Sequence, residues 1–227
     1  MKGKKDKCNR QCFMCRLCVP GWQEAIDAHQ SVISYKKNEV ILSEGTQVSG
    51  MYFVLNGLVK VHKQWGENKE IILRIATNGE ILGHRGLGYD DLYPISATAL
   101  EPTTVCFVSL DFFQTTLSIN HQFLYELMMF FAAELKVSER KMRDMSHLSV
   151  KSRLAQSLLA FRKKFGANEQ GVIGLQLSRA DLAAYVGATY ETISRTLQEM
   201  AEQKLLAVDG KQICIKNESA MLELLGD

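Results

Sequence analysis

The sequence lacks the long apolar runs of a membrane protein. No stretch of it approaches the ~20 consecutive apolar residues that a membrane-spanning helix needs. The basic N-terminus is followed by no apolar segment of the kind that secretory signals contain. Internal repeats and low-complexity segments are also missing. We therefore expect a cytoplasmic protein that does not contact a membrane.

A large charge of one sign is missing as well, because the formal net charge is only +2 at pH 7. With 46% hydrophobic and 23% charged residues, the 227-residue chain has the composition of one or two ordinary globular domains. No Ser/His/Asp triad and no paired carboxylates stand out, so nothing in the sequence indicates an enzyme. Five histidines are scattered along the chain, each more typical of a structural residue than of a ligand: His29, His62, His84, His121 and His147.

Cysteine, in contrast, is concentrated in one place. Four of the six cysteines lie close together near the N-terminus, at Cys8, Cys12, Cys15 and Cys18, while Cys106 and Cys214 stand apart. In a chain without a secretory signal, such a cluster is typical of metal-binding or redox-active thiols. We therefore interpret residues 1–20 as a cysteine-rich sensor arm. The spacing Cys-x3-Cys-x2-Cys also occurs in radical S-adenosylmethionine enzymes, but those need an α/β barrel that this chain does not offer.

The second segment, residues 21–118, is dominated by strand signals. After a short helical stretch at 21–30, apolar runs such as MYFVLNGLVKVHK and EIILRIA alternate with glycine-bearing turns. Short strands at a spacing of about 8–12 residues are typical of a sandwich or jelly roll. The sequence therefore predicts a β jelly-roll sensory domain here.

From about Asp111 the apolar period changes to that of a helix. Residues 121–147 contain no glycine or proline, and their apolar residues recur at a mean spacing of about 3.5, as in a coiled-coil seam. We therefore predict a dimerisation helix over residues 119–147, because two-fold pairing is the commonest oligomer. The alternative is one long helix of the protein's own core. The predicted interface residues are Leu124, Leu127, Phe131, Leu135, Ser138, Met142 and Met145.

The last segment, residues 148–227, carries the most specific pattern in the chain. Ser178 is a good N-cap for a helix over 179–186, Gly187 permits a left-handed corner, and Thr189 can cap a second helix. Apolar residues recur at helical spacing in this second helix. An Asp-Gly pair then separates two short β runs, which predicts a hairpin behind it. Together these signals predict a winged helix-turn-helix.

The polar face of the second predicted helix carries groups suited to the DNA major groove. Arginine pairs with guanine, glutamate accepts from base amines, and serine contacts a base or a phosphate. A solvated helix face is the alternative. Residues 150–227 hold ten Lys/Arg and nine Asp/Glu, so specificity must come from a few base contacts on a dimer rather than from phosphate attraction. The predicted DNA-contacting residues are Glu191, Ser194, Arg195, Gln198, Thr189 and Arg179.

This α+β arrangement of a β jelly roll, a long helix and a C-terminal winged helix-turn-helix resembles the CRP/FNR superfamily of bacterial transcription regulators over essentially the whole chain. The segment ETISR at 191–195 resembles the Glu-x-x-Ser-Arg reading motif of the FNR-like branch. The resemblance implies a cyclic-nucleotide-binding-like fold for the β domain. It also implies a homodimer that reads palindromic double-stranded DNA with half-sites like TTGA, and that contacts RNA polymerase if it is an activator.

The resemblance also gives the cysteines a role. Members of the FNR-like branch hold a [4Fe–4S] cluster on three N-terminal cysteines and one cysteine of the β domain, and so respond to oxygen, nitric oxide or redox state. The segments LCVP and TTVC are similar to that pattern. The implied ligands are Cys12, Cys15, Cys18 and Cys106, with Cys8 as an extra thiol. Zinc on the same four thiolates and a thiol switch are the alternatives.

Two departures from the family pattern shape further expectations. Cyclic-AMP-binding members use a glutamate after a glycine and then an Arg-Ser pair, but here His84 and Arg85 follow the glycine and Ile95-Ser96 replaces Arg-Ser. A buried phosphate would lack its counter-charge, so we expect no cyclic-nucleotide binding and interpret His84 and Arg85 as surface or turn residues.

A neutral Ser138 stands where oxygen sensors tend to carry an acid, which predicts a dimer with or without the cluster. A small-molecule or haem sensor in the β domain is a further alternative.

Overall fold

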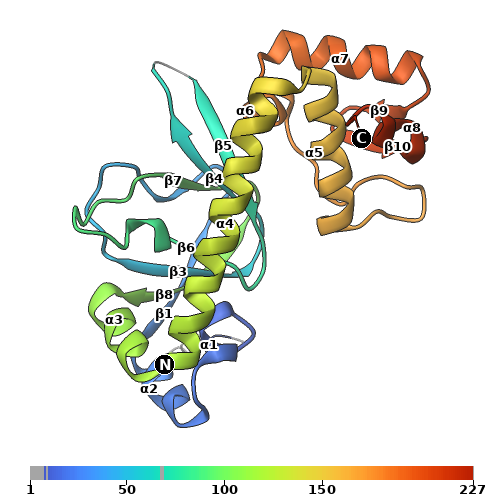
Figure 1. Ribbon diagram of the computed structural model, residues 1–227. Coiled ribbons are helices and arrows are strands. Elements are labelled where there is room, and N and C mark those ends of the chain that lie inside the picture. The colour runs from blue at the N-terminus through green and yellow to red at the C-terminus, as the bar shows by residue number, and fades with distance from the viewer. Residues whose placement is uncertain (1–7, 9, 67–68, 227) are drawn as a thin grey trace. The chain divides into compact units, whose positions relative to one another are not determined.

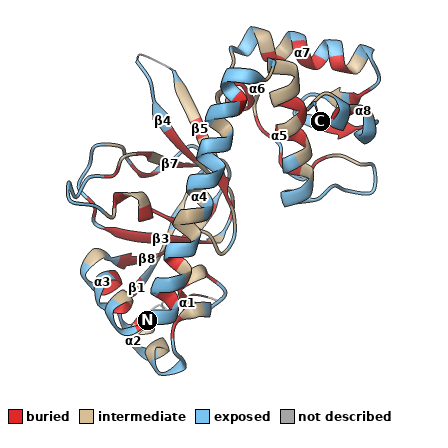
Figure 2. Cartoon of the chain, in the orientation of Figure 1, coloured by how far each residue is buried: buried red, intermediate tan, exposed pale blue. Residues whose placement is uncertain are grey.

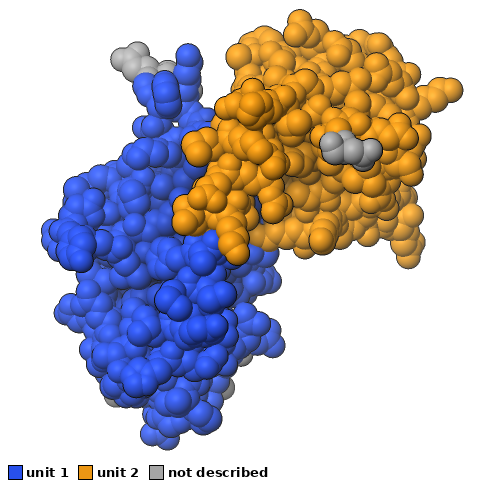
Figure 3. All heavy atoms as spheres, viewed as in Figure 1, with its two compact units in different colours: residues 1–134 blue, residues 135–227 orange. Residues whose placement is uncertain are grey.

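The computed structural model describes residues 8, 10–66 and 69–226, which form two compact units, Met1–Glu134 and Leu135–Asp227 (Figures 1 and 3). The first unit is built mainly from strands and the second mainly from helices. The predicted fold class is thereby confirmed, whereas the finer division at residues 20, 118 and 147 stays a prediction. No helix in the described part of the chain is both long and apolar enough to cross a membrane.

The N-terminal unit begins with three short helical elements: α1 (Phe13–Leu17), the 3-10 helix η1 (Pro20–Trp22) and α2 (Gln23–His29). Long-range hydrogen bonds fasten this arm to the rest of the unit. The backbone N–H of Phe13 donates to the carbonyl of Gly79 at 2.9 Å, and that of Val19 donates to Oδ1 of Asn120 at 2.8 Å. The predicted arm is therefore a packed layer of the unit, at least from residue 10 onward.

Eight strands form two four-stranded antiparallel sheets, as a jelly roll requires. The first sheet has the order β1-β8-β3-β6 and the second the order β2-β7-β4-β5. The strands are β1 (Gln30–Tyr35), β2 (Val40–Leu42), β3 (Gly50–Asn56), β4 (Val59–Gln64), β5 (Glu70–Ala76), β6 (Ile81–Leu82), β7 (Ser96–Ala99) and β8 (Thr103–Ser109). The register of β1 against β8 places Cys106 opposite Val32, so the distant cysteine lies on a central strand.

The core lies along the inner strands, where Figure 2 shows buried residues on β3 and β8. Met51, Phe53 and Val54 of β3 are fully buried because this strand has a neighbour on either side. Gly50 starts β3 at a point where a Cβ would lie 2.0 Å from the carbonyl oxygen of Val108. This close approach of two backbones explains why glycine is needed there.

Two helices follow the sheets, α3 (Leu110–Ile119) and α4 (His121–His147). Phe112 and Phe113 of α3 are buried against the β domain, and Phe123 of α4 is fully buried. The helices are separated by Asn120, whose buried amide donates to the carbonyl of Thr116 at 3.0 Å. The long helix predicted from the apolar period is therefore present, and its early turns pack on the chain's own β domain.

The C-terminal unit has the predicted winged helix-turn-helix. Its elements are α5 (Val150–Phe165), α6 (Arg179–Val186), α7 (Tyr190–Glu202), β9 (Leu206–Asp209), β10 (Gln212–Ile215) and α8 (Glu218–Glu223). Ser178 caps α6 by accepting from the N–H of Asp181 at 3.0 Å, and Thr189 caps α7 by accepting from the N–H of Thr192 at 3.2 Å. The strands β9 and β10 pair antiparallel across the Asp-Gly turn.

Gly187 ends α6 in the left-handed conformation, with φ of 73° and ψ of 53°. We expect Gly187→Ala to lower the free energy of unfolding by about 1–2 kcal/mol, because a Cβ is strained in this region. A Cβ would also meet Cε of Met145 at 2.2 Å, although that flexible side chain can move. Urea unfolding followed by circular dichroism measures the change.

Gly21→Ala is the matched control, since a Cβ at Gly21 would have no atom within 4 Å and the φ of this residue is not positive. Equal stability of the Gly187 and Gly21 variants would show that the corner between α6 and α7 does not need its left-handed glycine.

Candidate functional site

The polar face of α7 is positioned by the buried face opposite to it. Ile193 and Met200 are fully buried on the inner side of the helix. Glu191, Arg195 and Gln198 are exposed on the outer side, and Ser194 is partly exposed. The sequence-predicted reading residues therefore share one surface of α7, which is the arrangement that a recognition helix needs.

The guanidinium group of Arg195 is held only weakly by other side chains of the protein. Its side chain is 73% exposed, and Nε lies 3.8 Å from Oε1 of Glu199, a distance typical of a weak surface pair. Arg179 has a different place, because its guanidinium donates to the carbonyl of Gly210 at 2.9 Å. This contact fastens the first residue of α6 to the turn of the wing, and gives Arg179 a positioning role.

Three thiols of the N-terminal arm converge on one point. The Sγ atoms of Cys8, Cys12 and Cys15 all lie within 4.8 Å of one another, and Cys8 is 3.9 Å from each of the other two. All three residues are buried, as is Cys106, whose thiol interacts with that of Cys8. Four thiols thus meet in the interior of the N-terminal unit, from two segments almost a hundred residues apart in sequence.

Cys18 is also buried but does not belong to this group, which differs from its predicted place beside Cys12 and Cys15. The short helix α1 is the reason. Cys12 is its N-cap and its sulfur accepts from the N–H of Cys15 at 3.5 Å, so these two thiols lie together. Cys18 is the C-cap at the other end of α1. Cys8, predicted as the extra thiol, takes its place in the group.

Proximity and burial shift the thiol pKa values in opposite directions. Hydrogen bonds with Cys106, Cys12 and Cys15 lower the pKa of Cys8 strongly. Interactions with Cys12 and Cys8, with burial, raise the pKa of Cys15, and burial raises that of Cys18 to about 12. The thiols of the group therefore titrate together rather than independently.

A chain of hydrogen bonds extends from Cys106 to the surface. The Cys106 thiol donates to Oε1 of Gln30 at 3.1 Å, and Nε2 of Gln30 donates to Asp27 at 3.1 Å. Arg10 donates to the second oxygen of Asp27 at 2.8 Å. The strand cysteine and the N-terminal arm are therefore linked by side chains of α2 and β1. Sequence reasoning missed Gln30 because its role depends on a contact 76 residues away.

The same arm also contacts the long helix. The ring of Phe13 in α1 packs against Phe123 and Phe130 of α4, with centroid distances of 5.8 and 5.5 Å. Phe13 directly follows Cys12 in the sequence, so the thiol group and the contact with α4 involve adjacent residues. This contact connects the cysteine group to the helix that was predicted to form a dimer.

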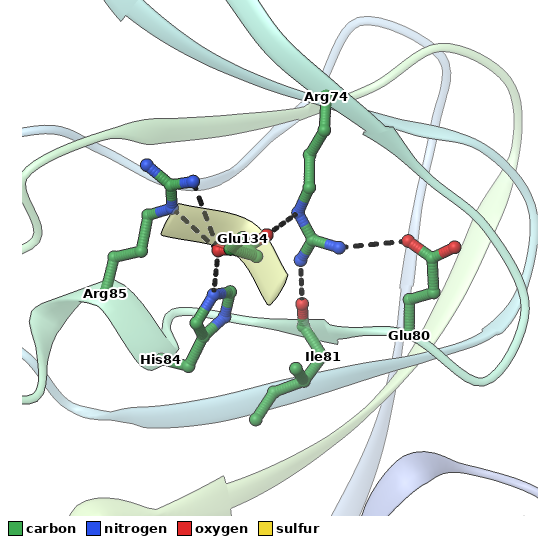
Figure 4. Close-up of polar contacts among 6 residues, drawn as sticks. All are labelled: Arg74, Glu80, Ile81, His84, Arg85 and Glu134. Carbon is green, nitrogen blue, oxygen red and sulfur yellow. Dashed lines mark hydrogen bonds and ion pairs between the residues drawn. The ribbon is translucent and has the colours of Figure 1, made fainter. Parts of the chain in front are cut away.

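A second cluster of polar side chains lies between the β domain and α4, within the N-terminal unit (Figure 4). Oε2 of Glu134 accepts from Nε2 of His84 at 2.9 Å and from Nε of Arg85 at 3.1 Å. Oε1 of Glu134 lies 3.2 Å from Nε of Arg74. Three side chains of the β domain thus point at one carboxylate of the helix.

This cluster corrects the interpretation of His84 as a surface or turn residue. His84 does lie in a 3-10 turn, η2 (His84–Gly86), but its side chain is only 2% exposed. Burial lowers the pKa of His84, although the hydrogen bond to Glu134 acts in the opposite direction. Burial therefore disfavours the charged form of the ring, and Nε2 is the ring nitrogen that faces the Glu134 carboxylate.

The predicted interface residues of α4 fall on two different faces. Leu127 is only 2% exposed in the core of the N-terminal unit, which corrects its prediction as an interface residue. Phe131 is partly buried beside His84. The apolar period did not distinguish the face that the β domain covers from the face that it leaves open. Five of the predicted residues are exposed, namely Leu124, Leu135, Ser138, Met142 and Met145, and the other exposed large apolar residues of α4 are Tyr125, Met128, Met129 and Val137.

A jelly roll, a long helix and a winged helix-turn-helix together define a DNA-binding regulator. Two family models agree with this class. "Cyclic nucleotide-binding domain" matches residues 32–120, and "Crp-like helix-turn-helix domain" matches residues 152–224.

Similar proteins narrow the class further. The chain is 31% identical over 197 residues to "Probable transcriptional regulator flp" of Lacticaseibacillus casei, covering 87% of this chain and 88% of that one. It is 24% identical to the "Anaerobic regulatory protein" of Pasteurella multocida (strain Pm70), covering 96% of this chain and 82% of that one. FixK2 from Bradyrhizobium japonicum has a similar structure, with a TM-score of 0.77, 26% identity, and coverage of 87% of this chain and 98% of that chain.

The chain belongs to the CRP/FNR family of transcription regulators, which bind DNA through the helix-turn-helix and are not enzymes. The resemblance stated from the sequence is thereby confirmed.

Replacing Glu134 by glutamine is expected to remove a pH-dependent part of the stability. Burial raises the pKa of Glu134, but His84, Arg74 and Arg85 outweigh burial and lower it from 4.5 to about 2. The charged carboxylate therefore stabilises the fold above about pH 4.5, and this contribution is lost as the pH falls toward 2. The wild type should exceed Glu134→Gln by about 2–3 kcal/mol near neutral pH, with the two converging near pH 2.

Urea unfolding over this pH range measures the difference. Glu126→Gln on the same helix is the control, because Glu126 accepts a hydrogen bond from the neutral Gln122. A difference between wild type and Glu134→Gln that does not change with pH would contradict the assignment.

Proposed function

We propose that this regulator acts as a homodimer on palindromic DNA with half-sites like TTGA, and that an iron–sulfur cluster on its N-terminal cysteines makes it respond to oxygen, nitric oxide or redox state. The observation that carries the proposal is the convergence of Cys8, Cys12 and Cys15 near Cys106 inside a unit of a DNA-binding regulator. The anaerobic function in the name of the Pasteurella relative supports the choice of signal.

The reading residues are Arg195, Glu191 and Ser194, with Gln198 and Thr189 beside them. Arg195 supplies a bidentate donor for guanine, and the Glu191 carboxylate accepts from base amines. Exposure of both side chains supports these roles. Arg179 acts indirectly by holding the wing turn through Gly210. If the protein is an activator, RNA polymerase is the further partner.

A second copy of the chain covers the exposed apolar face of α4. Leu124, Met128, Leu135 and Met142 lie on this face at intervals of four or seven residues, as in a coiled-coil seam. Exposed large apolar side chains in such a row are typical of a protein interface. Ser138 is also exposed and carries no charge, so pairing of the two helices does not depend on neutralising an acid there.

The thiols that would hold the metal centre are Cys8, Cys12, Cys15 and Cys106. Four cysteine thiolates are the usual donor set of a [4Fe–4S] cluster, and the burial of all four shields it from water. When bound, the cluster supplies an oxygen- and redox-sensitive group. The chain's own contribution is to hold the four thiols, with Gln30 facing Cys106 and Phe13 pressing the arm against α4.

Zinc is the second candidate, because four buried thiols without nitrogen donors also fit a structural zinc site. The β domain gives less support to a haem or small-molecule sensor. His62 is buried and hydrogen-bonded to Thr98 at 2.9 Å, and His84 is held by Glu134. Two buried histidines are therefore engaged with protein partners rather than available to a ligand.

Arg195→Ala is expected to weaken binding to a duplex that carries two inverted TTGA half-sites spaced about one helical turn apart. Loss of a bidentate guanine contact removes about 1–3 kcal/mol per half-site, which is tenfold or more in affinity. Fluorescence anisotropy at fixed salt measures the dissociation constant. A duplex with one half-site scrambled should bind more weakly than the palindrome if the protein is a dimer.

Arg162→Ala is the matched control, because Arg162 belongs to α5 and pairs with Glu218 at 2.9 Å. The reading assignment fails if the Arg162 and Arg195 variants lose affinity equally, or if Arg195→Ala binds like the wild type.

The ligand set is tested by serine variants reconstituted with iron and sulfide under anaerobic conditions. Cys8→Ser, Cys12→Ser, Cys15→Ser and Cys106→Ser are each expected to lose bound iron, acid-labile sulfide and visible absorption. Cys18→Ser should retain all three, because its thiol lies outside the group. Cys214→Ser on the wing strand is the control for the loss of a remote buried thiol.

Loss of iron in Cys18→Ser with retention in Cys8→Ser would instead support the ligand set that the family resemblance implies. Stoichiometric zinc without sulfide in anaerobically purified wild type would replace the iron–sulfur proposal with a zinc site.

A further inference from the structure

We propose that Arg74, His84 and Arg85 form an anion-binding site in the β domain, and that Glu134 of the same chain occupies this site as a built-in ligand. The inference concerns the charged cluster of Figure 4 and does not depend on the iron–sulfur proposal. Its ligand class is a carboxylate, supplied by the chain and replaceable by a small free carboxylate when Glu134 is removed.

The hydrogen-bond donors of this site belong to the β domain, and the carboxylate that accepts from them belongs to the helix α4. Arg74 lies on β5, whereas His84 and Arg85 lie in the turn η2, and all three reach the carboxylate of Glu134 on α4. The N···O distances lie between 2.9 and 3.2 Å, and both carboxylate oxygens are used. Such convergence of donors on one anion is the geometry of a binding site rather than of an isolated surface pair.

The donors are held in place independently of Glu134. Arg74 also pairs with Glu80 at 3.0 Å and donates to the carbonyl of Ile81. Gly83 precedes His84 with φ of +86°, and a Cβ at Gly86 would lie 2.5 Å from Val48. The turn that presents His84 and Arg85 is therefore shaped by glycines and by packing within the β domain, so the site is expected to persist when the carboxylate is absent.

Burial makes the carboxylate necessary. The side chains of Arg74, Arg85 and Glu134 are only 17%, 27% and 14% exposed. Two guanidinium groups in such a place need counter-charges, because an unpaired buried charge is costly. Glu80 supplies one negative charge beside Arg74, and Glu134 supplies the second. Removing Glu134 leaves one positive charge in excess at a site already preorganised for an anion.

Apolar side chains of α4 also line the anion-binding site. The rings of Phe130 and Phe131 lie 5.1 and 5.3 Å from the ring of His84, and Cζ of Arg74 lies 5.6 Å from the Phe130 ring. One turn of α4 therefore delivers both an anion and an apolar cover to the β domain. This is the combination that a bound ligand would supply, and it fixes this turn of α4 on the domain.

The test is chemical rescue of Glu134→Ala by sodium formate and sodium acetate, with sodium chloride at equal ionic strength as the salt control. Either carboxylate should raise the thermal unfolding midpoint of Glu134→Ala by about 3 °C or more over chloride, because it refills the vacated site. Wild type and Glu126→Ala should show no such excess. Adding Arg85→Met to Glu134→Ala should abolish the rescue.

Hydrogen exchange of the amides at 123–134 is the second readout. Glu134→Gln keeps the shape of the side chain but not its charge, so it should fold with faster exchange at these amides, and formate should slow the exchange in Glu134→Ala. Equal effects of formate and chloride on Glu134→Ala, or rescue that survives Arg85→Met, would overturn the proposal. Wild-type protection in Glu134→Gln would do so as well.

Discussion

The contact on which the N-terminal unit depends is the packing of Phe130 on α4. Its ring touches Phe13 of the cysteine arm on one side and His84 and Arg74 of the β domain on the other. Aromatic pairs of this kind add about 0.5–1.5 kcal/mol beyond the burial of their surface. The turn of α4 that carries Phe130 therefore contacts both the cysteine arm and the charged cluster around Glu134. The packing of the arm and the packing of the cluster are linked through this ring.

This arrangement assigns different parts to the two sites. The charged site is closed by the chain itself, because Glu134 satisfies donors from β5 and η2. The thiol group is assembled from the arm and Cys106. The sulfur atoms of its three arm cysteines lie close enough together to bind a metal ion. In the proposed function, the charged contact is the fixed anchor of α4 and the thiol group is the part that responds to the signal.

Local signals explain what was predictable from the sequence. The helix Arg179–Val186 was located to the residue, because its N-cap Ser178 and the left-handed Gly187 both act within a few positions of its ends. The hairpin of the wing was equally predictable from its Asp-Gly turn. Glu134 gave no such signal, since a glutamate within a helix looks ordinary until a fold brings His84 to it across 50 residues. The prediction that Leu127 lies in the dimer interface was wrong for a related reason. Periodicity shows that a helix has an apolar face but not which part of the protein covers it.

In the cysteine arm, too, the sequence pattern does not show which residues the fold brings together, although the cysteines are close in sequence. Four thiols with two or three residues between them allow several sets of three, and spacing alone does not choose among them. The choice depends on where α1 begins and ends, because a helix places Cys12 and Cys15 on one side and carries Cys18 to its far end. The family resemblance favoured Cys18, whereas the position of α1 in this chain places Cys8 with Cys12 and Cys15. The set of thiols that come together in this arm therefore depends on the position of α1 as well as on the spacing of the cysteines.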